Sequence, residues 1–334
     1  MVIEVHTQQK NYPVYLERGI LSRVQELVSE NGSYFIVSDD GVDEKWKECL
    51  QAQFPDAPMH IFKNGEASKN PEVWLEILAD MLKNEVSRKD TVIALGGGVV
   101  TDMAGFAAAS YMRGIRYISI PTTTLSMIDS SVGGKTGIDF EGRKNCIGAF
   151  WQPDMVIADP ETLSTLPRRH FINGLAEAVK AGVILDEKLF ELFEQDEWEA
   201  HLDEIIYRSL IAKRDIVEQD EREGGIRKLL NFGHTFGHAY ESQGNLNTWL
   251  HGECVAMGMM TVIKNEDVKK RLSAVLKRMG LPESCNYDPK ETAKLIRNDK
   301  KADHKRITIV QADEIGKGHL EEWTMEDVER KLML

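Results

Sequence analysis

Short apolar runs alternate with amphipathic stretches through the first half of the chain. The runs are rich in Val, Ile and Tyr, as buried strands are. They cover residues 2–5, 34–38, 59–62, 91–95, 117–120 and 155–158. Between two of them, Trp74, Ile77, Leu78, Met81 and Leu82 recur at the i, i+3, i+4, i+7 and i+8 spacing of one helical face. This alternation predicts a doubly wound, Rossmann-like α/β domain with a mostly parallel sheet.

The pattern changes after Pro160. Helical patterns follow over residues 187–198 and 202–218, and β-branched runs are scarce until residues 307–310. We therefore expect two domains, an α/β domain over residues 1–160 and a mainly α-helical domain over residues 161–334. The length of 334 residues agrees with two domains, since a domain has about 150 residues.

Composition excludes several classes of protein. The chain has 41 basic and 54 acidic residues, a net charge of −13, and is 42% hydrophobic, so it is neither disordered nor an evident nucleic-acid binder. The first residues of the chain lack a signal-peptide pattern. No apolar run is as long as a membrane span, which needs about 18 residues. The 4 cysteines show no CxxC spacing, so we expect reduced thiols. These features predict a cytoplasmic protein without nucleic-acid or membrane partners.

A glycine-rich turn follows the apolar run 91–95. Gly96, Gly97 and Gly98 lead from this predicted strand into a helix of small residues. Glycines at such a turn let the backbone approach a pyrophosphate, and the N–H groups of the following helix favour its negative charge. The run is not the GxGxxG fingerprint, because Val99 and Thr101 occupy positions where that motif needs other residues. A purely structural glycine turn is the alternative.

Two further predicted strands end in polar residues. Asp39 follows the run 34–38, in the position where the ribose hydroxyls of a dinucleotide are commonly held, although a single Asp there can equally cap a turn. Thr122, Thr123 and Thr124 follow the run 117–120. Open α/β sheets bind ligands at the carboxyl ends of their strands, so the three strand ends together predict a dinucleotide site.

Lysines and amide groups gather in residues 128–137 and 142–145. We expect a glycine-rich loop in which Lys135 and Lys144 bind a phosphate, a carboxylate or a developing oxyanion, while Gly133 and Gly134 allow close approach. A solvated surface loop is the alternative.

Histidines in the second half suggest a divalent metal. His234 and His238 are at i, i+4, on one face of a helix, and His251 follows in the stretch LHGE. Catalytic zinc takes three protein ligands and leaves one position open, and the spacing makes His234 and His238 the first choice. Glu177 and Lys180, at i, i+3, form either a buried pair or a helix-surface ion pair. The residues alone thus predict metal-assisted redox chemistry on a phosphorylated, hydroxylated small molecule.

A set of motifs between about residues 60 and 300 resembles the 3-dehydroquinate synthases, a family of the sugar phosphate cyclase superfamily. The motifs are GEASK (65–69), GGGVVTD (96–102), YMRG (111–114), PTTTL (121–125), DSSVGGKTGID (129–139), KNCIGAFWQP (144–153), GLAEAVK (174–180), DEREGGIRKLLNFGHTFGHAYE (220–241), LHGE (250–253) and DKK (299–301). The glycine and threonine motifs also occur in metal-dependent alcohol and glycerol dehydrogenases. DSSVGGKTG, KNCIGAFWQP and DEREGGIRKLLNFGH distinguish the synthases.

The resemblance implies roles for individual residues. Metal ligands would be Glu177, His234 and His251, with zinc as the metal and cobalt as the alternative, so that His238 becomes a substrate contact. NAD would be bound by Asp39, Glu66, Lys69, Gly97, Gly98, Asp102, Thr122, Thr123, Asp129, Lys135 and Lys144. Catalytic and substrate contacts would be Arg113, Asp129, Lys135, Lys144, Asn145, Lys180, Lys213, Arg227, Asn231, His238 and Lys300.

The resemblance also implies an activity in the shikimate pathway. The family converts 3-deoxy-D-arabino-heptulosonate 7-phosphate to 3-dehydroquinate and phosphate, by transient oxidation with NAD, phosphate elimination, re-reduction and intramolecular aldol closure. It further implies that residues 1–160 bind NAD and that residues 161–334 bind the metal and the substrate. The active site would lie in a cleft between the two domains, and the protein would be a homodimer. A metal-dependent polyol or glycerol-type dehydrogenase, another sugar phosphate cyclase and an inactive binding protein are the alternatives. The last would be expected to have lost a metal ligand.

Three features depart from the family pattern. Thr101 stands where glycine is usual, Thr124 stands where leucine is usual, and the stretch between Met260 and Gly280 is short. A β-branched residue at position 101 predicts a negative φ there, because positive φ is costly for such residues.

Overall fold

The computed structural model describes residues 1–28, 32–244, 248–299 and 306–333. The chain forms two compact units, Met1–Pro167 and Arg168–Leu334. They are called the first and the second unit below, and each is described by itself.

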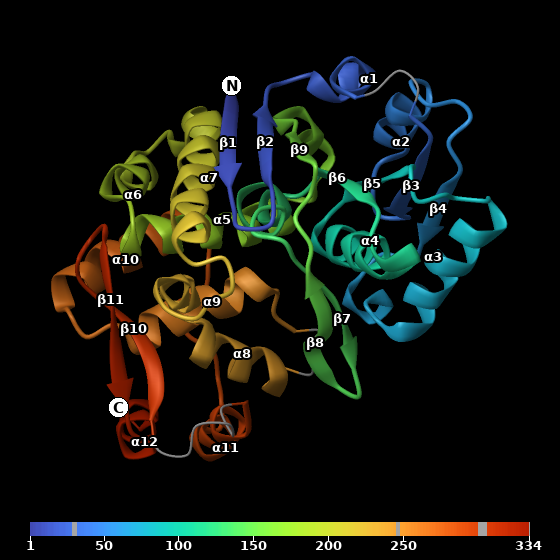
Figure 1. The fold of residues 1–334 in the computed structure, drawn as a ribbon. Helices are drawn as coiled ribbons and strands as arrows, with labels where there is room; N and C mark the ends of the chain where they lie inside the picture. The colour runs from blue at the N-terminus through green and yellow to red at the C-terminus, as the bar shows by residue number, and fades with distance from the viewer. Residues whose placement is uncertain (29–31, 245–247, 300–305, 334) are drawn as a thin grey trace. The chain divides into compact units, whose positions relative to one another are not determined.

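The first unit is built on a seven-stranded sheet in the order β1-β2-β9-β6-β5-β3-β4 (Figure 1). Its strands are β1 (Val2–His6), β2 (Asn11–Leu16), β3 (Tyr34–Asp39), β4 (Met59–Phe62), β5 (Thr91–Gly96), β6 (Arg116–Pro121) and β9 (Met155–Ala158). All neighbours pair in parallel except β1 with β2. The doubly wound class and the six strands are confirmed. Strand β2 was not predicted, because Pro13 weakens its strand pattern.

Helices pack on both faces of this sheet. On one face, α3 (Pro71–Lys83) and α4 (Gly98–Ser110) share a hydrophobic cluster with β3 and β5. On the other, a second cluster includes residues of α1 (Val24–Leu27) and α2 (Glu44–Gln51). Ile77 and Met81 of α3 are buried in the first cluster, and Trp74 and Leu78 pack against it. Leu82 does not belong to the buried face, since its side chain is 63% exposed. Eight residues at about 100° each place Leu82 about 80° around the helix from Trp74.

The lysine-rich segment is an antiparallel hairpin, which extends away from the sheet in Figure 1. Its strands are β7 (Lys135–Phe140) and β8 (Arg143–Phe150), so the expected loop is wrong for residues 135–137 and 143–145. Residues 131–134, which include Gly133 and Gly134, lie outside helices and strands as expected. Gly137 pairs with Gly148 across the hairpin. An added Cβ on Gly148 would lie 2.1 Å from the Thr136 carbonyl oxygen. These glycines therefore permit close pairing of two strands rather than a turn.

The second unit is mainly helical, as expected. Its helices are α5 (Arg168–Ile184), α6 (Glu187–Glu194), α7 (Leu202–Gln219), α8 (His234–Gln243), α9 (His251–Val262), α10 (Glu266–Met279), α11 (Pro289–Asp299) and α12 (Met325–Leu332). Strands β10 (Ile307–Glu314) and β11 (Lys317–Trp323) form a hairpin. The helix expected over 187–198 ends at Glu194, after which Trp198 packs against Phe193 with ring centroids 5.8 Å apart.

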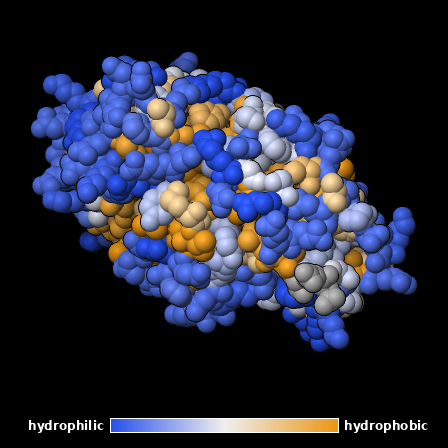
Figure 2. All heavy atoms as spheres, turned by 90° about the horizontal axis from the view of Figure 1, so that it is seen from above, coloured by the Kyte–Doolittle hydropathy of each residue, from blue (hydrophilic) through white to orange (hydrophobic). Residues whose placement is uncertain are grey.

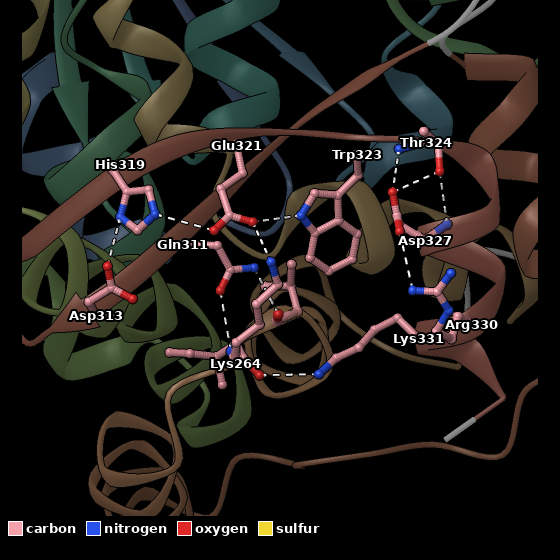
Figure 3. A network of polar contacts seen from close by, with 12 residues as sticks. Lys264, Gln311, Asp313, His319, Glu321, Trp323, Thr324, Asp327, Arg330 and Lys331 are labelled. Carbon is pink, nitrogen blue, oxygen red and sulfur yellow. Dashed lines mark hydrogen bonds and ion pairs between the residues drawn. The ribbon is translucent and has the colours of Figure 1, made fainter.

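A polar network joins the β10–β11 hairpin to the connection between α9 and α10 (Figure 3). The Glu321 carboxylate pairs with Lys264 and accepts the Trp323 Nε1–H at 2.8 Å. Gln311 accepts the Lys264 backbone N–H at 3.2 Å and donates to the Val262 carbonyl at 3.0 Å. The stretch from Met260 to Gly280, which is short against the family pattern, thus contains the end of α9, the connection 263–265 and α10, and the hairpin contacts the connection.

Other sequence expectations concern the surface and the cysteines. On the face seen in Figure 2, hydrophobic residues lie in patches among hydrophilic ones. Among the described residues, no helix has the length and apolar character needed to cross a membrane. Cys49, Cys146, Cys254 and Cys285 are all free, as predicted. Thr101 lies within α4 and is absent from the residues of positive φ, which confirms its predicted backbone conformation.

Candidate active site

Helix α5 carries an acidic and a basic residue about one turn apart in the interior of the second unit. Glu177 and Lys180 are 3% and 2% exposed, and Lys180 Nζ forms an ion pair with Glu177 Oε2. Every residue from Phe171 to Ile184 is buried, so α5 is a central helix. Of the two alternatives for Glu177 and Lys180, the buried pair is confirmed and the helix-surface ion pair is wrong, because both charged groups are removed from water.

The start of α9 is fixed against α5 one turn before Glu177. Asn173 Oδ1 accepts the backbone N–H groups of Gly252 at 2.7 Å and Glu253 at 3.2 Å, which supplies partners that the first turn of a helix otherwise lacks. An added Cβ on Gly252 would lie 1.9 Å from the Asn173 carbonyl oxygen. Glycine thus permits the close approach that brings His251, the first residue of α9, next to Glu177.

Helix α8 approaches α9 in the same way. An added Cβ on Gly258 would lie 2.0 Å from the carbonyl oxygen of Gly233, the residue that precedes α8. His234 is the first residue of α8, and its ring centroid lies 5.2 Å from that of His251. Close backbone packing of α5, α8 and α9 therefore gathers one side chain from each.

The donor atoms of these three side chains converge. His234 Nε2 and His251 Nε2 lie 3.7 and 3.6 Å from Glu177 Oε1. His234 Nδ1 is 3.2 Å from the Phe232 carbonyl oxygen. A carbonyl only accepts, so Nδ1 carries the proton and the lone pair of Nε2 faces Glu177.

The protonation states follow from burial and neighbouring charge. Burial by itself would raise the pKa of Glu177, but Lys180 and the two imidazoles hold that pKa well below its ordinary value. Burial, with Lys180 adding to it, holds the pKa of His234 well below its ordinary value. Burial would also lower the pKa of His251, yet the carboxylates of Glu177 and Glu241 raise it to about 9. A cation that binds here would therefore displace a proton from His251.

These residues fit a divalent metal. Both carboxylate oxygens of Glu177 are buried and accept no hydrogen bond from the described residues, although Lys180 pairs with one of them. The donor atoms of Glu177, His234 and His251 lie within 4.8 Å of one another. Two ligands about 2.0–2.1 Å from a tetrahedral zinc are about 3.4 Å apart, close to the spacing found here. One carboxylate and two imidazoles are a ligand set that leaves a position for substrate.

His238 lies one turn after His234 on α8 and is exposed. Its ring centroid is 5.3 Å from that of His234 and 5.8 Å from that of His251. The donors nearest Glu177 come from His234 and His251, whereas His238 groups with Glu241 and His251. Helical spacing thus predicted the shared face of His234 and His238, and only the fold brings in α5 and α9.

A loop before α8 presents further polar candidates. Asp220 accepts the backbone N–H groups of Gly224, Gly225 and Arg227 at 2.9, 2.7 and 3.0 Å. Arg227 is 1% exposed and donates to the Glu221 carbonyl oxygen. The loop continues into a short 3-10 helix, Ile226–Asn231, which ends at another candidate.

Asn231 of that helix has a partner that the sequence analysis did not single out. Its Nδ2 donates to Glu223 Oε1 at 2.8 Å, and Glu223 has φ of 62°. The position of Glu223 inside the motif DEREGGIR was the sequence signal that could have identified it as a candidate. Lys213 lies on α7, and Lys300 falls outside the described residues.

In the first unit, three adjacent strands end at the positions predicted to bind a dinucleotide. Strands β3, β5 and β6 are neighbours in the sheet. They end at Asp39, Gly96 and Pro121, the last followed by Thr122 and Thr123. The strand order reverses between β3 and β5, and open α/β sheets bind ligands at such a switch point.

The start of α4 fits a pyrophosphate. Gly97 precedes the helix, which has no side-chain cap. Added Cβ atoms on Gly97 and Gly98 would lie 3.1 Å from Thr123 Cγ2 and 3.4 Å from Ser130 Oγ. The Ser130 hydroxyl is buried and has no hydrogen-bond partner among the described residues. A narrow backbone cradle, an uncapped helix start and an unsatisfied hydroxyl are what a bound phosphate would use.

A buried lysine, itself a candidate, contacts two other candidates from distant parts of the sequence. Lys69 is 4% exposed, and its Nζ donates to Asp102 Oδ2 at 2.5 Å and to Asn145 Oδ1. Burial alone would lower the pKa of Lys69, but Asp102 and Glu66 raise it above the ordinary value, so the ammonium stays charged. Lys69 therefore connects α4, which carries Asp102, with the β7–β8 hairpin, which carries Asn145.

Asp39 is already engaged in local structure. Its Oδ1 accepts the backbone N–H groups of Gly41 and Val42 at 2.9 and 3.1 Å, and its Oδ2 accepts from Asn64 Nδ2 at 2.9 Å. Asp39 therefore caps the turn after β3, as the alternative interpretation of the sequence held. Its contact with a ribose stays a prediction.

The remaining candidates of the first unit lie on short elements beyond the sheet. Glu66 Oε1 is 3.8 Å from Lys144 Nζ. Asp129 lies in the short π-helix Ser126–Ser130, Lys135 begins β7, and Arg113 ends the 3-10 helix Tyr111–Arg113. Arg113 and Asn145 have φ of 66° and 53°, a strained conformation for such residues that is common at functional sites.

Two family models match the chain in succession. Residues 59–173 match the model "3-dehydroquinate synthase N-terminal", and residues 174–302 match "3-dehydroquinate synthase C-terminal". The two matches together span most of the chain and meet within α5.

Curated relatives match over nearly the full length. The 3-dehydroquinate synthase of Dictyoglomus turgidum is 37% identical over 98% of this chain and 95% of its own. That of Streptococcus mutans is 36% identical over 99% of both chains.

Solved structures of related folds also match. A 2-deoxy-scyllo-inosose synthase, complexed with carbaglucose-6-phosphate, NAD+ and Co2+, has a TM-score of 0.89, 24% identity and 99% coverage of both chains. ValA, a 2-epi-5-epi-valiolone synthase from Streptomyces hygroscopicus with NAD+ and Zn2+ bound, has a TM-score of 0.87, 27% identity and coverage of 98% of this chain and 97% of its own. A probable glycerol dehydrogenase from Sinorhizobium meliloti, at 12% identity and a TM-score of 0.60, shares the fold alone.

Proposed function

The chain belongs to the 3-dehydroquinate synthase family and is an enzyme of that activity, and we propose that Glu177, His234 and His251 hold the divalent metal it uses. The reaction converts 3-deoxy-D-arabino-heptulosonate 7-phosphate to 3-dehydroquinate and phosphate. The observation that supports the metal assignment most strongly is the convergence of the two histidine Nε2 atoms on a buried Glu177 oxygen, at 3.7 and 3.6 Å.

We propose NAD and Zn2+ or Co2+ as the cofactors, since related structures contain them. When bound, NAD accepts and returns a hydride, and the metal acts as a Lewis acid on substrate hydroxyls. The proposed NAD contacts surround the ends of β3, β5 and β6 and the hairpin β7–β8; they are Asp39, Glu66, Lys69, Gly97, Gly98, Asp102, Thr122, Thr123, Asp129, Lys135 and Lys144.

Lys69 contributes to this site through its charge. The buried ion pair with Asp102 keeps the ammonium in place, and Asn145 accepts another of its hydrogens. The backbone at the start of α4 and the charge of Lys69 together would favour the negative charge of the pyrophosphate.

The substrate is an anion, and the proposed contacts for it are mostly cationic or amide side chains. They are Arg113, Asp129, Lys135, Lys144, Asn145, Lys180, Lys213, Arg227, Asn231, His238 and Lys300. Lysine and arginine bind phosphate and carboxylate oxygens through charge-assisted hydrogen bonds. Among them, Lys180 also balances the charge of Glu177 through their ion pair.

His238 is proposed to contact the substrate rather than the metal. It is exposed and shares one face of α8 with His234. An imidazole in this position can hold or release a proton at a phosphate or hydroxyl oxygen near neutral pH.

We also propose that the protein is cytoplasmic and forms a homodimer. Analytical ultracentrifugation of the purified protein would test the homodimer.

The function is tested by measuring two products in one reaction. The protein is incubated with the heptulosonate phosphate, NAD at a small fraction of the substrate concentration, and Zn2+ or Co2+. We expect many phosphates to be released per NAD, without lasting absorbance of NADH, because the reaction is redox-neutral. Steady NADH formation from glycerol without phosphate release from the sugar acid would instead assign the chain to the dehydrogenases that share its fold.

A further inference from the structure

One face of α8 presents three titratable side chains. His234, His238 and Glu241 follow one another at i, i+4 and i+7, which places them in a row along the helix. The proposed function uses the first two. It leaves the third, the Glu241 carboxylate, without a role.

Glu241 is buried beside a proposed metal ligand. It is 7% exposed, and a buried carboxylate is costly unless a positive or hydrogen-bonding group faces it. Its Oε2 lies 4.0 Å from His251 Nδ1, while His251 Nε2 lies 3.6 Å from Glu177 Oε1. The imidazole of His251 therefore stands between two carboxylates, one at each ring nitrogen.

This arrangement matches the way proteins orient metal-binding histidines. A ligating imidazole almost always donates its other N–H to a carboxylate or a carbonyl, which fixes the tautomer and the ring plane. For His234 that partner is the Phe232 carbonyl, 3.2 Å from Nδ1. We propose that Glu241 is the corresponding positioning residue for His251, an inference that rests on the proposed function.

The separation of the two groups is consistent with this role. At 4.0 Å the contact is an ion pair rather than a hydrogen bond. A movement of about 1 Å brings Nδ1 and Oε2 into hydrogen-bond range. Since α8 and α9 pack through glycine backbones, side-chain rotation rather than helix movement would close this gap.

Another buried glutamate provides a matched control. Glu253 is 8% exposed and lies two residues after His251, but both its oxygens accept hydrogen bonds from Arg169, each at 2.7 Å. It also accepts the Leu250 backbone N–H at 2.9 Å. Glu253→Gln makes the same chemical change at similar burial, on a carboxylate that faces Arg169.

The test compares Zn2+ affinities of the full-length parent protein, Glu241→Gln, Glu241→Asp and Glu253→Gln. Dissociation constants come from competition with a chromophoric chelator, and metal content comes from elemental analysis. We expect Glu241→Gln to weaken Zn2+ binding by about 10–100-fold. We expect Glu241→Asp, which keeps the charge, to recover part of this loss, and Glu253→Gln to stay within about twofold of the parent. The Co2+-loaded Glu241→Gln protein should also show a changed visible absorption spectrum, because the ligand geometry changes.

The possible outcomes separate the inference from the function beneath it. Zn2+ binding by Glu241→Gln within about twofold of the parent, or an equal loss in Glu253→Gln, overturns the positioning role while the metal site stands. Two metal ions per parent chain also overturn it, since Glu241 would then be a ligand with His238 and His251. If the parent binds no metal, the proposed function itself fails. Should Glu241→Gln not fold, a loss of fivefold or more in Glu241→Asp supports the role, and a smaller one overturns it.

Discussion

At the scale of single residues, His238 and His251 differ in what they face. Their ring centroids are 5.8 Å apart, yet His251 Nε2 points to the buried oxygen of Glu177, whereas His238 is exposed on α8. The proposed roles, a metal ligand for His251 and a substrate contact for His238, rest on this difference.

This difference predicts opposite metal contents for two alanine variants that both lose turnover. His251→Ala should lose the stoichiometric metal and at least about 10³-fold in kcat, because a Lewis acid supplies several kcal/mol to the transition state. His238→Ala should keep one metal per chain and still lose turnover. Elemental analysis and phosphate release measure the two properties on the same samples. Retained metal in His251→Ala, or its loss in His238→Ala, would contradict the ligand assignment.

Residue types and short spacings could be predicted from the sequence, but the grouping of distant residues could not. The i, i+4 spacing of His234 and His238 is visible in the sequence and is real. Glu177 joins His234 through helix packing, which no local pattern encodes. The role of Glu241 depends on a contact with another helix at 4.0 Å, so the spacing of residues on α8 gives no sign of it.

At the scale of elements, helix packing sets the geometry of the metal site. Helices α5 and α9 approach so closely that an added Cβ on Gly252 would lie 1.9 Å from the Asn173 carbonyl oxygen. The obstacle is backbone, which cannot rotate away as a side chain can. The distance between Glu177 and His251 therefore depends on a residue that donates nothing to the metal.

Gly252→Ala should consequently separate these helices. We expect the variant to lose at least about 10-fold in Zn2+ affinity and about 1–3 kcal/mol of stability, as overpacking typically costs. Chelator competition and thermal unfolding measure both. Gly224→Ala is the control, because an added Cβ there meets only Asp220 Oδ1 at 4.0 Å. Parent-like metal affinity in Gly252→Ala would show that helix spacing does not set the site.

The loop organised by Asp220 should respond to pH. Burial would raise the pKa of Asp220, but the N–H groups of Gly225, Arg227 and Gly224 lower it below the ordinary value. A carboxylate whose folded-state pKa lies below its unfolded value of about 3.9 stabilises the fold above that pH. The stabilisation is lost as pH falls through the folded value.

Asp220→Asn should therefore weaken this loop at neutral pH, by about 1–2 kcal/mol. The measurement is amide hydrogen exchange at Gly224, Gly225 and Arg227 in parent and variant, corrected for intrinsic rates. We expect about tenfold faster exchange in the variant at pH 7 and a difference that shrinks as pH falls below about 4. A difference that does not change with pH would exclude the carboxylate charge as its cause.

The elements themselves were predicted with uneven success. Buried parallel strands are apolar throughout and were found, because each has the same environment on both faces. The sequence predicts a loop where the β7–β8 hairpin lies, because the glycines and lysines there resemble turn and surface residues. Its glycines instead permit the pairing of Gly137 with Gly148, a close contact that only appears once the two strands are aligned.

At the scale of the whole molecule, each unit contains one of the two candidate binding sites. The first has an uncapped helix start at the switch point of a parallel sheet. The second has a buried carboxylate that two imidazoles approach. The fold class and the family could be predicted from the sequence, through strand and helix alternation and long motifs. The assignment of NAD to residues 1–160, of metal and substrate to residues 161–334, and of the active site to a cleft between them stays a prediction.

Metal removal and restoration test the central claim most directly. Protein stripped by a chelator is titrated with Zn2+ or Co2+ while phosphate release from the heptulosonate phosphate and NADH absorbance are followed together. We predict that phosphate release returns in proportion to the metal added, reaches its limit at one metal per chain, and leaves no NADH behind. Phosphate release by the fully stripped protein, or NADH that accumulates with each turnover, would contradict the account.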